Sequence, residues 1–330
     1  MAWKNFFFIA ILMITGWLFW NCIQKSSHGE KKVLVKKIPE PSQKEDQPKH
    51  FTSTSSIHLK PSSGPVLSIK DTIKGQEGKG MVSFLKTFAG AFSPEEMNRM
   101  VQIILEEASK SNPITFGIEV QDFLNEYPGG ETILLQAFPK IHSKDHLFQL
   151  AKIFQEFSAQ NKNFALQLGN SLKSEDPIHR EMAIYGLLFS TYPEIQARIL
   201  PLYQDETEQV SVRFAASFYL ERNFKVFSPE QQKVIHKYAF QKGFDFRYPD
   251  LAGNSLLLAA QGGFSSNEVN KLNSLIESSP SPLIGLRAIE ALKISGSISL
   301  EEMALKAKIF KEQLPQTDLR RQILDLWLVK

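Results

Sequence analysis

The chain has 330 residues, of which 42% are hydrophobic and 25 are Phe, and this composition excludes a wholly disordered protein. Its net charge is +3, but residues 24–77 carry ten Lys against six acidic residues, so residues 78–330 are near −2. That balance excludes a general electrostatic attraction of the body to nucleic acid. The only cysteine, Cys22, excludes an internal disulfide and a thiolate zinc site in the body.

Residues 6–23 form an uncharged run of 18 residues that reaches about 27 Å as a helix, which is enough to span a bilayer core. Trp17 and Trp20 near its end suit a membrane interface. We therefore expect residues 1–23 to be a transmembrane anchor or an uncleaved signal. A cleaved signal peptide and a lipoprotein are alternatives, which the bulky residues after Gly16 and before Cys22 disfavour.

Residues 24–77 contain nine Ser, five Pro and ten Lys without helical periodicity, and this composition predicts a disordered linker. Its lysines favour a cytoplasmic body by the positive-inside rule. The cysteine-free body and the N-terminal place of the anchor favour a periplasmic or exported body by a small margin. The sequence leaves both sides of the membrane open.

Sequence signals for the start of a helix recur throughout residues 78–330. Ser93 with Glu96, Ser228 with Gln231, Ser265 with Glu268, and Ser299 with Glu302 have the spacing of capping boxes, and Asp176-Pro177 supplies another cap. Proline and glycine residues that end helices lie between these N-caps. No segment shows the alternation of apolar and polar residues that is typical of a β-strand. We expect an all-α body, with a helical region of divergent repeats or a helical cap at 78–173 and helical repeats at 174–330. A plain helical bundle is the alternative to the repeats. Residues 81–92 are expected either on a membrane surface or as the first core helix.

A repeat is suggested by the spacing of charged residues near predicted helix starts. Arg180, Arg213, Asp250, Arg287 and Arg320 follow one another at intervals of 33, 37, 37 and 33 residues. Such a period is typical of stacked helical hairpins, an α-solenoid. The expected hairpins pair 177–191 with 193–203, 207–222 with 229–242, 250–261 with 266–277, and 282–294 with 300–314.

Three of these segments resemble HEAT repeats: residues 176–183 (DPIHREMA), 212–216 (VRFAA) and 286–292 (LRAIEAL). In that family an Asp-Pro turn, an Arg and a following Ala mark the second-helix region of each unit. The resemblance covers residues 174–330 and implies a protein-binding scaffold. Asp250 departs from it, because no Arg stands at the matching place.

The arginines of this repeat are the candidate site. Arg180, Arg213, Arg287 and Arg320 are expected either to pair with Asp or Glu of a neighbouring repeat, such as Asp205, Glu206 or Asp318, or to bind an acidic partner. His142 and His146, with Asp145 between them, have the spacing of metal ligands. Ser143 looks like an N-cap, however, so we expect two exposed polar residues at a helix start and no metal or other cofactor.

The sequence contains no nucleophile elbow, kinase set or Cys-His pair, so we expect a non-catalytic scaffold. The expected partner is another protein of unknown identity, bound through a groove of the repeats, with the membrane contacted through residues 6–23. Nucleic acid and a small-molecule substrate are not expected. The alternatives are an enzyme or ligand-binding protein with a site between helices, and a spacer that sets the distance between membrane and partner.

Overall fold

The computed structural model describes residues 93–330, apart from 128, 279, 280, 319, 329 and 330. These residues form fourteen α-helices and three 3-10 helices, and none of them belongs to a strand, which confirms the all-α prediction. The expected anchor at 6–23, the linker at 24–77 and the segment at 81–92 lie outside the described residues. Among the helices that the structure describes, none is long and apolar enough to cross a membrane.

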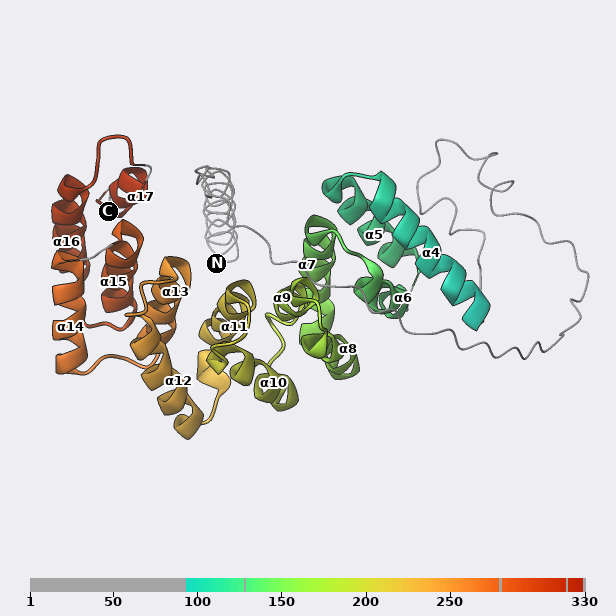
Figure 1. Cartoon of the computed structure of the whole chain (residues 1–330), viewed down its shortest axis with the longest axis horizontal. Helices are drawn as coiled ribbons and strands as arrows, with labels where there is room; N and C mark the ends of the chain where they lie inside the picture. The colour runs from blue at the N-terminus through green and yellow to red at the C-terminus, as the bar shows by residue number, and fades with distance from the viewer. Residues whose placement is uncertain (1–92, 128, 279–280, 319, 329–330) are drawn as a thin grey trace, which may run out of the picture. The chain divides into compact units, whose positions relative to one another are not determined.

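The helices carry the labels of Figure 1. The first five α-helices are α4 (Pro94–Lys110), α5 (Pro113–Glu126), α6 (Gly130–Ala137), α7 (Lys144–Gln160) and α8 (Lys162–Leu168). They are followed by α9 (Pro177–Gly186), α10 (Pro193–Gln204), α11 (Val210–Asn223), α12 (Pro229–Lys242), α13 (Pro249–Ala260), α14 (Ser266–Glu277), α15 (Pro282–Ile294), α16 (Leu300–Gln313) and α17 (Arg320–Leu328). The 3-10 helices are η1 (Phe138–Lys140), η2 (Gly169–Lys173) and η3 (Phe224–Val226).

Local capping explains where many of these helices begin. All four expected capping boxes form, before α4, α12, α14 and α16. In each, the N-cap Ser accepts a hydrogen bond from the backbone N–H three residues on, and the side chain there accepts one from the Ser N–H. The Asp176 carboxylate likewise caps α9, and Pro177 follows as its first residue. These starts are therefore fixed by residues adjacent in sequence.

The odd-numbered helices form a row in chain order. α5 packs against α7, α7 against α9, α9 against α11, α11 against α13, and α13 against α15. The even-numbered helices pack against members of this row: α10 against α11, α12 against α13, and α14 against α15 (Figure 1). Each helix therefore makes its main contacts with near neighbours in the chain.

Three of the four expected pairs were wrong by one helix, whereas α15 does pack against α16 as expected. α9 packs mainly against η2, α7 and α11 rather than α10, while α10 packs mainly against α11. The units are consequently α10 with α11, α12 with α13, and α14 with α15. Caps and prolines fix the start of a helix but not the neighbour that covers its apolar face, so the sequence left this phase undetermined.

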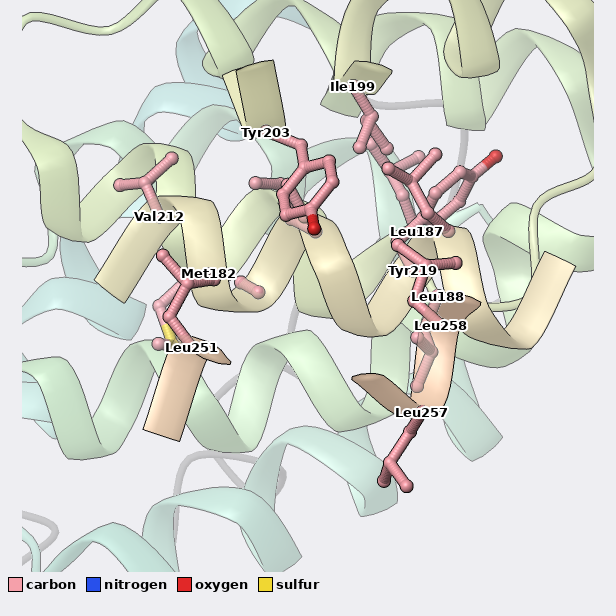
Figure 2. Close-up of a cluster of buried hydrophobic side chains, with 14 of the residues drawn as sticks. Met182, Leu187, Leu188, Ile199, Tyr203, Val212, Tyr219, Leu251, Leu257 and Leu258 are labelled. Carbon is pink, nitrogen blue, oxygen red and sulfur yellow. The ribbon is translucent and has the colours of Figure 1, made fainter. Parts of the chain in front are cut away.

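The core of the middle units comes from helices α9, α10, α11 and α13. Figure 2 shows Met182 of α9, Ile199 and Tyr203 of α10, Val212 and Tyr219 of α11, and Leu251 and Leu258 of α13 in one cluster. All are buried. The Tyr203 hydroxyl donates to Ser255 Oγ at 2.8 Å, and the Tyr219 hydroxyl donates to the Ser190 carbonyl at 2.6 Å. The cluster thus buries large rings without leaving these two hydroxyls unsatisfied.

Candidate protein-binding surface

Arg180 is a structural link between two turns. Its Nε and Nη2 donate to the two carboxylate oxygens of Glu208 at 2.8 and 2.6 Å, and Nη1 donates to the Ser174 carbonyl at 2.5 Å. Both side chains are mostly buried. Arg180 therefore joins the turn before α9 to the turn before α11, with Glu208 as its partner rather than Asp205 or Glu206.

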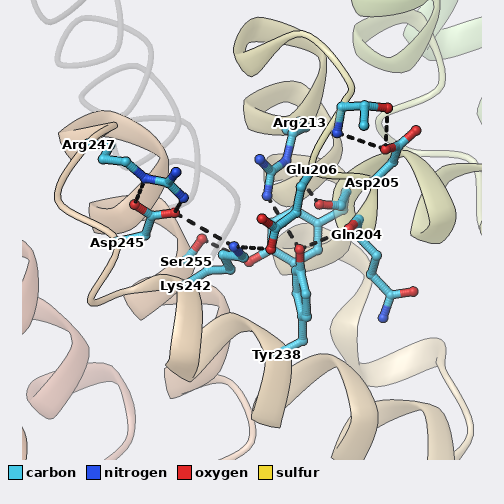
Figure 3. Close-up of polar contacts among 11 residues, drawn as sticks. Gln204, Asp205, Glu206, Arg213, Tyr238, Lys242, Asp245, Arg247 and Ser255 are labelled. Carbon is cyan, nitrogen blue, oxygen red and sulfur yellow. Dashed lines mark hydrogen bonds and ion pairs between the residues drawn. The ribbon is translucent and has the colours of Figure 1, made fainter.

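Arg213 lies in the polar network of Figure 3 and is only 3% exposed. Its Nε donates to the Tyr203 carbonyl and its Nη2 to the Tyr238 hydroxyl, each at 3.3 Å. The Tyr238 hydroxyl in turn donates to the Gln204 carbonyl at 3.0 Å. Arg213 therefore binds the end of α10 to α12 through neutral oxygens.

The same network contains ion pairs around the end of α12. Lys242 at the end of α12 pairs with Glu206 at 2.5 Å, and Arg247 pairs with Asp245 at 2.7 Å (Figure 3). The hydrogen bonds from Arg247 hold the pKa of Asp245 at about 2. Lys242 Nζ also lies 3.6 Å from the Asp245 carboxylate, so Lys242 connects the turn before α11 with the turn before α13.

The other two arginines are placed differently. Arg180 and Arg213 are each the fourth residue of a helix, whereas Arg287 is the sixth of α15 and Arg320 the first of α17. Arg320 pairs with Asp318 at 2.6 Å, within the turn before its own helix. Arg287 donates to Glu290 at 2.6 Å on the same helix. The four expected site residues are therefore not gathered in one place.

A second set of side chains lies between the odd-numbered helices, and we call it the odd-helix surface. Lys144 of α7 pairs with Glu181 of α9 at 2.9 Å, and the ring centroids of Phe148 and Tyr185 on the same two helices lie 6.0 Å apart. These contacts run across the row of helices. The surface comprises Lys144, Phe148, Glu181, Tyr185, Phe189, Phe214, Phe218, Glu221, Arg222, Arg287 and Glu290.

Aromatic side chains are partly exposed along this surface. Phe189, just after α9, is 38% exposed, and Phe218 of α11 is 41% exposed. The guanidinium carbon of Arg222 lies 4.5 Å from the centroid of the Phe189 ring, a cation–π contact. Aromatic and arginine side chains are enriched in protein interfaces.

The surface ends in a charged cluster over α13. Arg287 packs directly over Gly253. A side chain at position 253 would leave it no room, because a Cβ atom there would lie 2.8 Å from Cγ of Arg287. Burial raises the pKa of Glu221 to about 7, and the charge of Glu290 adds to this rise while Arg287 opposes it. Burial also raises the pKa of Asp250, again opposed by Arg287. The Arg287 guanidinium thus pairs with Glu290 and interacts electrostatically with carboxyl groups of α11 and α13.

The expectation that His142 and His146 are both exposed is wrong for His146. His142 is exposed, but His146 is buried. Nδ1 of His146 lies 2.7 Å from Ser143 Oγ, and Nε2 lies 3.1 Å from the Ser111 carbonyl after α4. Its ring packs edge-on against Phe116. His146 is therefore a core residue that joins α7 to the end of α4. The described residues contain no group of three His, Cys, Asp or Glu side chains arranged to hold a metal.

Comparison with known proteins gives no family for this chain. No protein-family model matches it, and no curated protein or solved structure matches it significantly.

Sequence reasoning missed the aromatic part of the odd-helix surface, although α11 carries a signal for it. The buried side of α11 includes Val212, Ala216 and Tyr219, while Phe214 and Phe218 form a second apolar pair four residues apart. A helix that is apolar on two sides in the middle of an array either packs on both sides or presents one side to a partner.

Proposed function

We propose that this protein is a HEAT-like α-solenoid, held at a membrane by residues 6–23, that acts as a scaffold and binds another protein through its odd-helix surface. The row of odd-numbered helices with even-numbered helices packed against it supports the solenoid architecture. So does the equal helical position of Arg180 and Arg213. The Arg-bearing helix α11 is then the second helix of its unit, as the HEAT resemblance implies.

The observation that carries the binding proposal is the strip of partly exposed aromatic side chains with charged neighbours. Phe189 is held by Arg222, and Tyr185 by Phe148, so these rings are already oriented before a partner arrives. Side chains that are ordered in advance lose less conformational entropy on binding. Aromatic and arginine side chains also contribute most of the energy in protein interfaces.

The test is site-specific photocrosslinking with the full chain in its native cells. Benzoylphenylalanine replaces Phe218 or Phe189 in separate experiments, and the control replaces Val234, which is 53% exposed on the even-numbered helix α12. We expect one discrete protein adduct from positions 218 and 189 and none from 234. Equal adducts from all three positions, or none from the first two, would contradict the proposal.

Once that adduct is identified, affinity provides the second measurement. Phe218→Ala should weaken binding of the partner by about tenfold or more, because truncation of a central aromatic typically costs at least about 1–2 kcal/mol. Val234→Ala, a truncation of similar exposure on α12, should leave the affinity unchanged.

We also propose that the body faces the periplasm or an equivalent exported space. The support is the absence of cysteine from residues 24–330. Protease added to cells whose outer membrane has been permeabilised should digest the body, detected with an antibody against the C-terminus. Protection until the inner membrane is lysed would place the body in the cytoplasm instead.

A further inference from the structure

Glu221 lies on the same side of α11 as the aromatic side chains of the odd-helix surface. Phe214, Phe218 and Glu221 are spaced four and three residues apart, so their side chains follow one another along one face of the helix. Phe218 is 41% exposed, and Glu221 is partly exposed. A partner that covers Phe218 therefore also removes Glu221 from water.

The Glu221 carboxyl accepts no hydrogen bond from any residue that the structure describes. Two other carboxylates of the array are buried with their donors in place: Glu208 accepts from Arg180 at 2.6 Å, and Glu181 accepts from Lys144 at 2.9 Å. A carboxylate that leaves water without such donors is strongly destabilised, whereas a neutral carboxyl is much less so. Complete burial of Glu221 should therefore favour its protonated form.

The charged groups that act on Glu221 come from α11 and α15. Burial raises the pKa of Glu221 to about 7, the charge of Glu290 adds to this rise, and Arg287 and Arg222 oppose it. Both guanidiniums already have partners, since Arg287 donates to Glu290 at 2.6 Å and Arg222 lies over an aromatic ring. On α13, which packs against both helices, Asp250 interacts with Arg287. The free protein therefore exchanges the Glu221 proton near neutral pH.

These surroundings decide which partner chemistry fits over Glu221. A basic side chain of the partner would meet Arg222 and Arg287, and an acidic side chain would meet Glu290. Like charges placed together in an interface are strongly unfavourable. An uncharged, apolar segment meets neither repulsion, and it also matches the Phe218 ring one turn earlier on α11. The surface at the end of α11 therefore suits an apolar segment without charge.

We infer that the partner places an uncharged, apolar segment over Phe218 and Glu221, and that its binding is coupled to uptake of a proton by the Glu221 carboxyl. The inference rests on the proposed function, because it states the partner chemistry and the regulation of the odd-helix surface. Acidic conditions then strengthen the complex, and alkaline conditions weaken it.

Proton linkage sets the size of this pH dependence. The bound state holds the proton more tightly than the free state does, so the affinity is highest below the pKa of the free carboxyl and falls as the pH rises above it. That pKa is about 7. One proton taken up per complex then makes the affinity about tenfold lower at pH 8 than at pH 6.

The test measures affinity by dilution of the photocrosslinked complex, which requires no purified partner. Cells produce the full chain with benzoylphenylalanine in place of Phe189, and their membranes are solubilised in detergent, diluted stepwise at pH 6 and pH 8, and irradiated. The dilution at which half of the adduct is lost reports the affinity. With Glu221 in place, half of the adduct should be lost at about tenfold less dilution at pH 8 than at pH 6.

Two variants assign the proton to Glu221. Glu221→Gln carries a neutral side chain of the same shape at every pH, so its complex should withstand the same dilution at pH 8 as at pH 6. The matched control Glu312→Gln, at an exposed position of α16, should keep the pH dependence of the native chain. Circular dichroism of each chain at both pH values establishes that the helices remain intact.

Three results would overturn the inference. They are a native complex that withstands the same dilution at both pH values, one that is stronger at pH 8, and a pH dependence that persists in Glu221→Gln. The second result would indicate a basic partner group on Glu221, and the third would assign the proton to another residue. In each case the adduct itself leaves the scaffold proposal standing. Absence of an adduct from positions 189 and 218 at both pH values would instead contradict the proposed function and this inference together.

Discussion

Glu221 offers a sharp test of the charged cluster over α13. Its pKa is raised from the ordinary 4.5 to about 7, chiefly by burial. Because the folded state binds this proton more tightly than the unfolded state does, the stability that the neutral carboxyl contributes is complete below about pH 4.5. It is lost as the pH rises through 7. Glu221→Gln keeps a neutral side chain of the same shape at every pH.

The size of the expected difference in stability follows from the pKa shift of Glu221. One pKa unit corresponds to about 1.4 kcal/mol, so the rise to about 7 sets an upper limit of about 3 kcal/mol. Glu221 is partly exposed, and water screens part of this energy, so we expect about 1–2 kcal/mol. Glu221→Gln should therefore be more stable than the native chain by that amount at pH 8, and nearly equal to it at pH 4.5.

The assay is urea unfolding of both chains at pH 4.5 and 8, followed by circular dichroism at 222 nm. Glu312→Gln, at an exposed position of α16, is the control and should show no pH-dependent difference. A Glu221→Gln chain whose stability relative to the native chain is the same at both pH values would refute the reasoning, since ionisation of Glu221 would then cost nothing in the folded state.

Three further changes probe the links between helices, each measured by urea unfolding. Arg180→Ala should cost about 3 kcal/mol, because it leaves the largely buried Glu208 without its bidentate partner, and the double variant with Glu208→Ala should recover part of the loss. Asn223→Ala should cost about 1–3 kcal/mol, since its buried amide donates at 2.9 Å to carbonyls of α11 and of the segment after α9; a neutral change would mean that water replaces it. His236→Ala should cost about 1–2 kcal/mol by removing the contacts to the end of α13 and to Glu268 at 3.0 Å, and an unchanged unfolding midpoint would exclude a stabilising role for this ring.

Local sequence signals predicted the helix starts well. The capping boxes at Ser93, Ser228, Ser265 and Ser299 all form, and the Asp176-Pro177 cap forms too. These signals succeed because each cap satisfies orphan N–H groups with side chains three residues away at most. Nothing beyond the first turn of the helix is required.

Features that depend on distant residues were harder to predict. The environment of His146 depends on the end of α4, 35 residues earlier, so its sequence neighbours suggested an exposed residue where the fold buries it. The partner of Arg180 is likewise set by the conformation of the turn before α11. The charged cluster at Arg287 depends on Gly253 in the adjacent helix, which no local pattern connects with it.

The phase of the helix pairs determines where the chain divides into cooperative units. α10 packs on α11, and α12 packs on α13. The turn after η3 therefore separates two complete pairs, whereas the turn after α10 lies inside the α10–α11 pair. A truncation that ends at Val226 retains the α10–α11 pair, but one that ends at Gln204 strips Tyr203 and Ile199 of the helix that covers them. Partial unfolding from the C-terminus should accordingly advance two helices at a time, with intermediates that end after α15, α13 and α11.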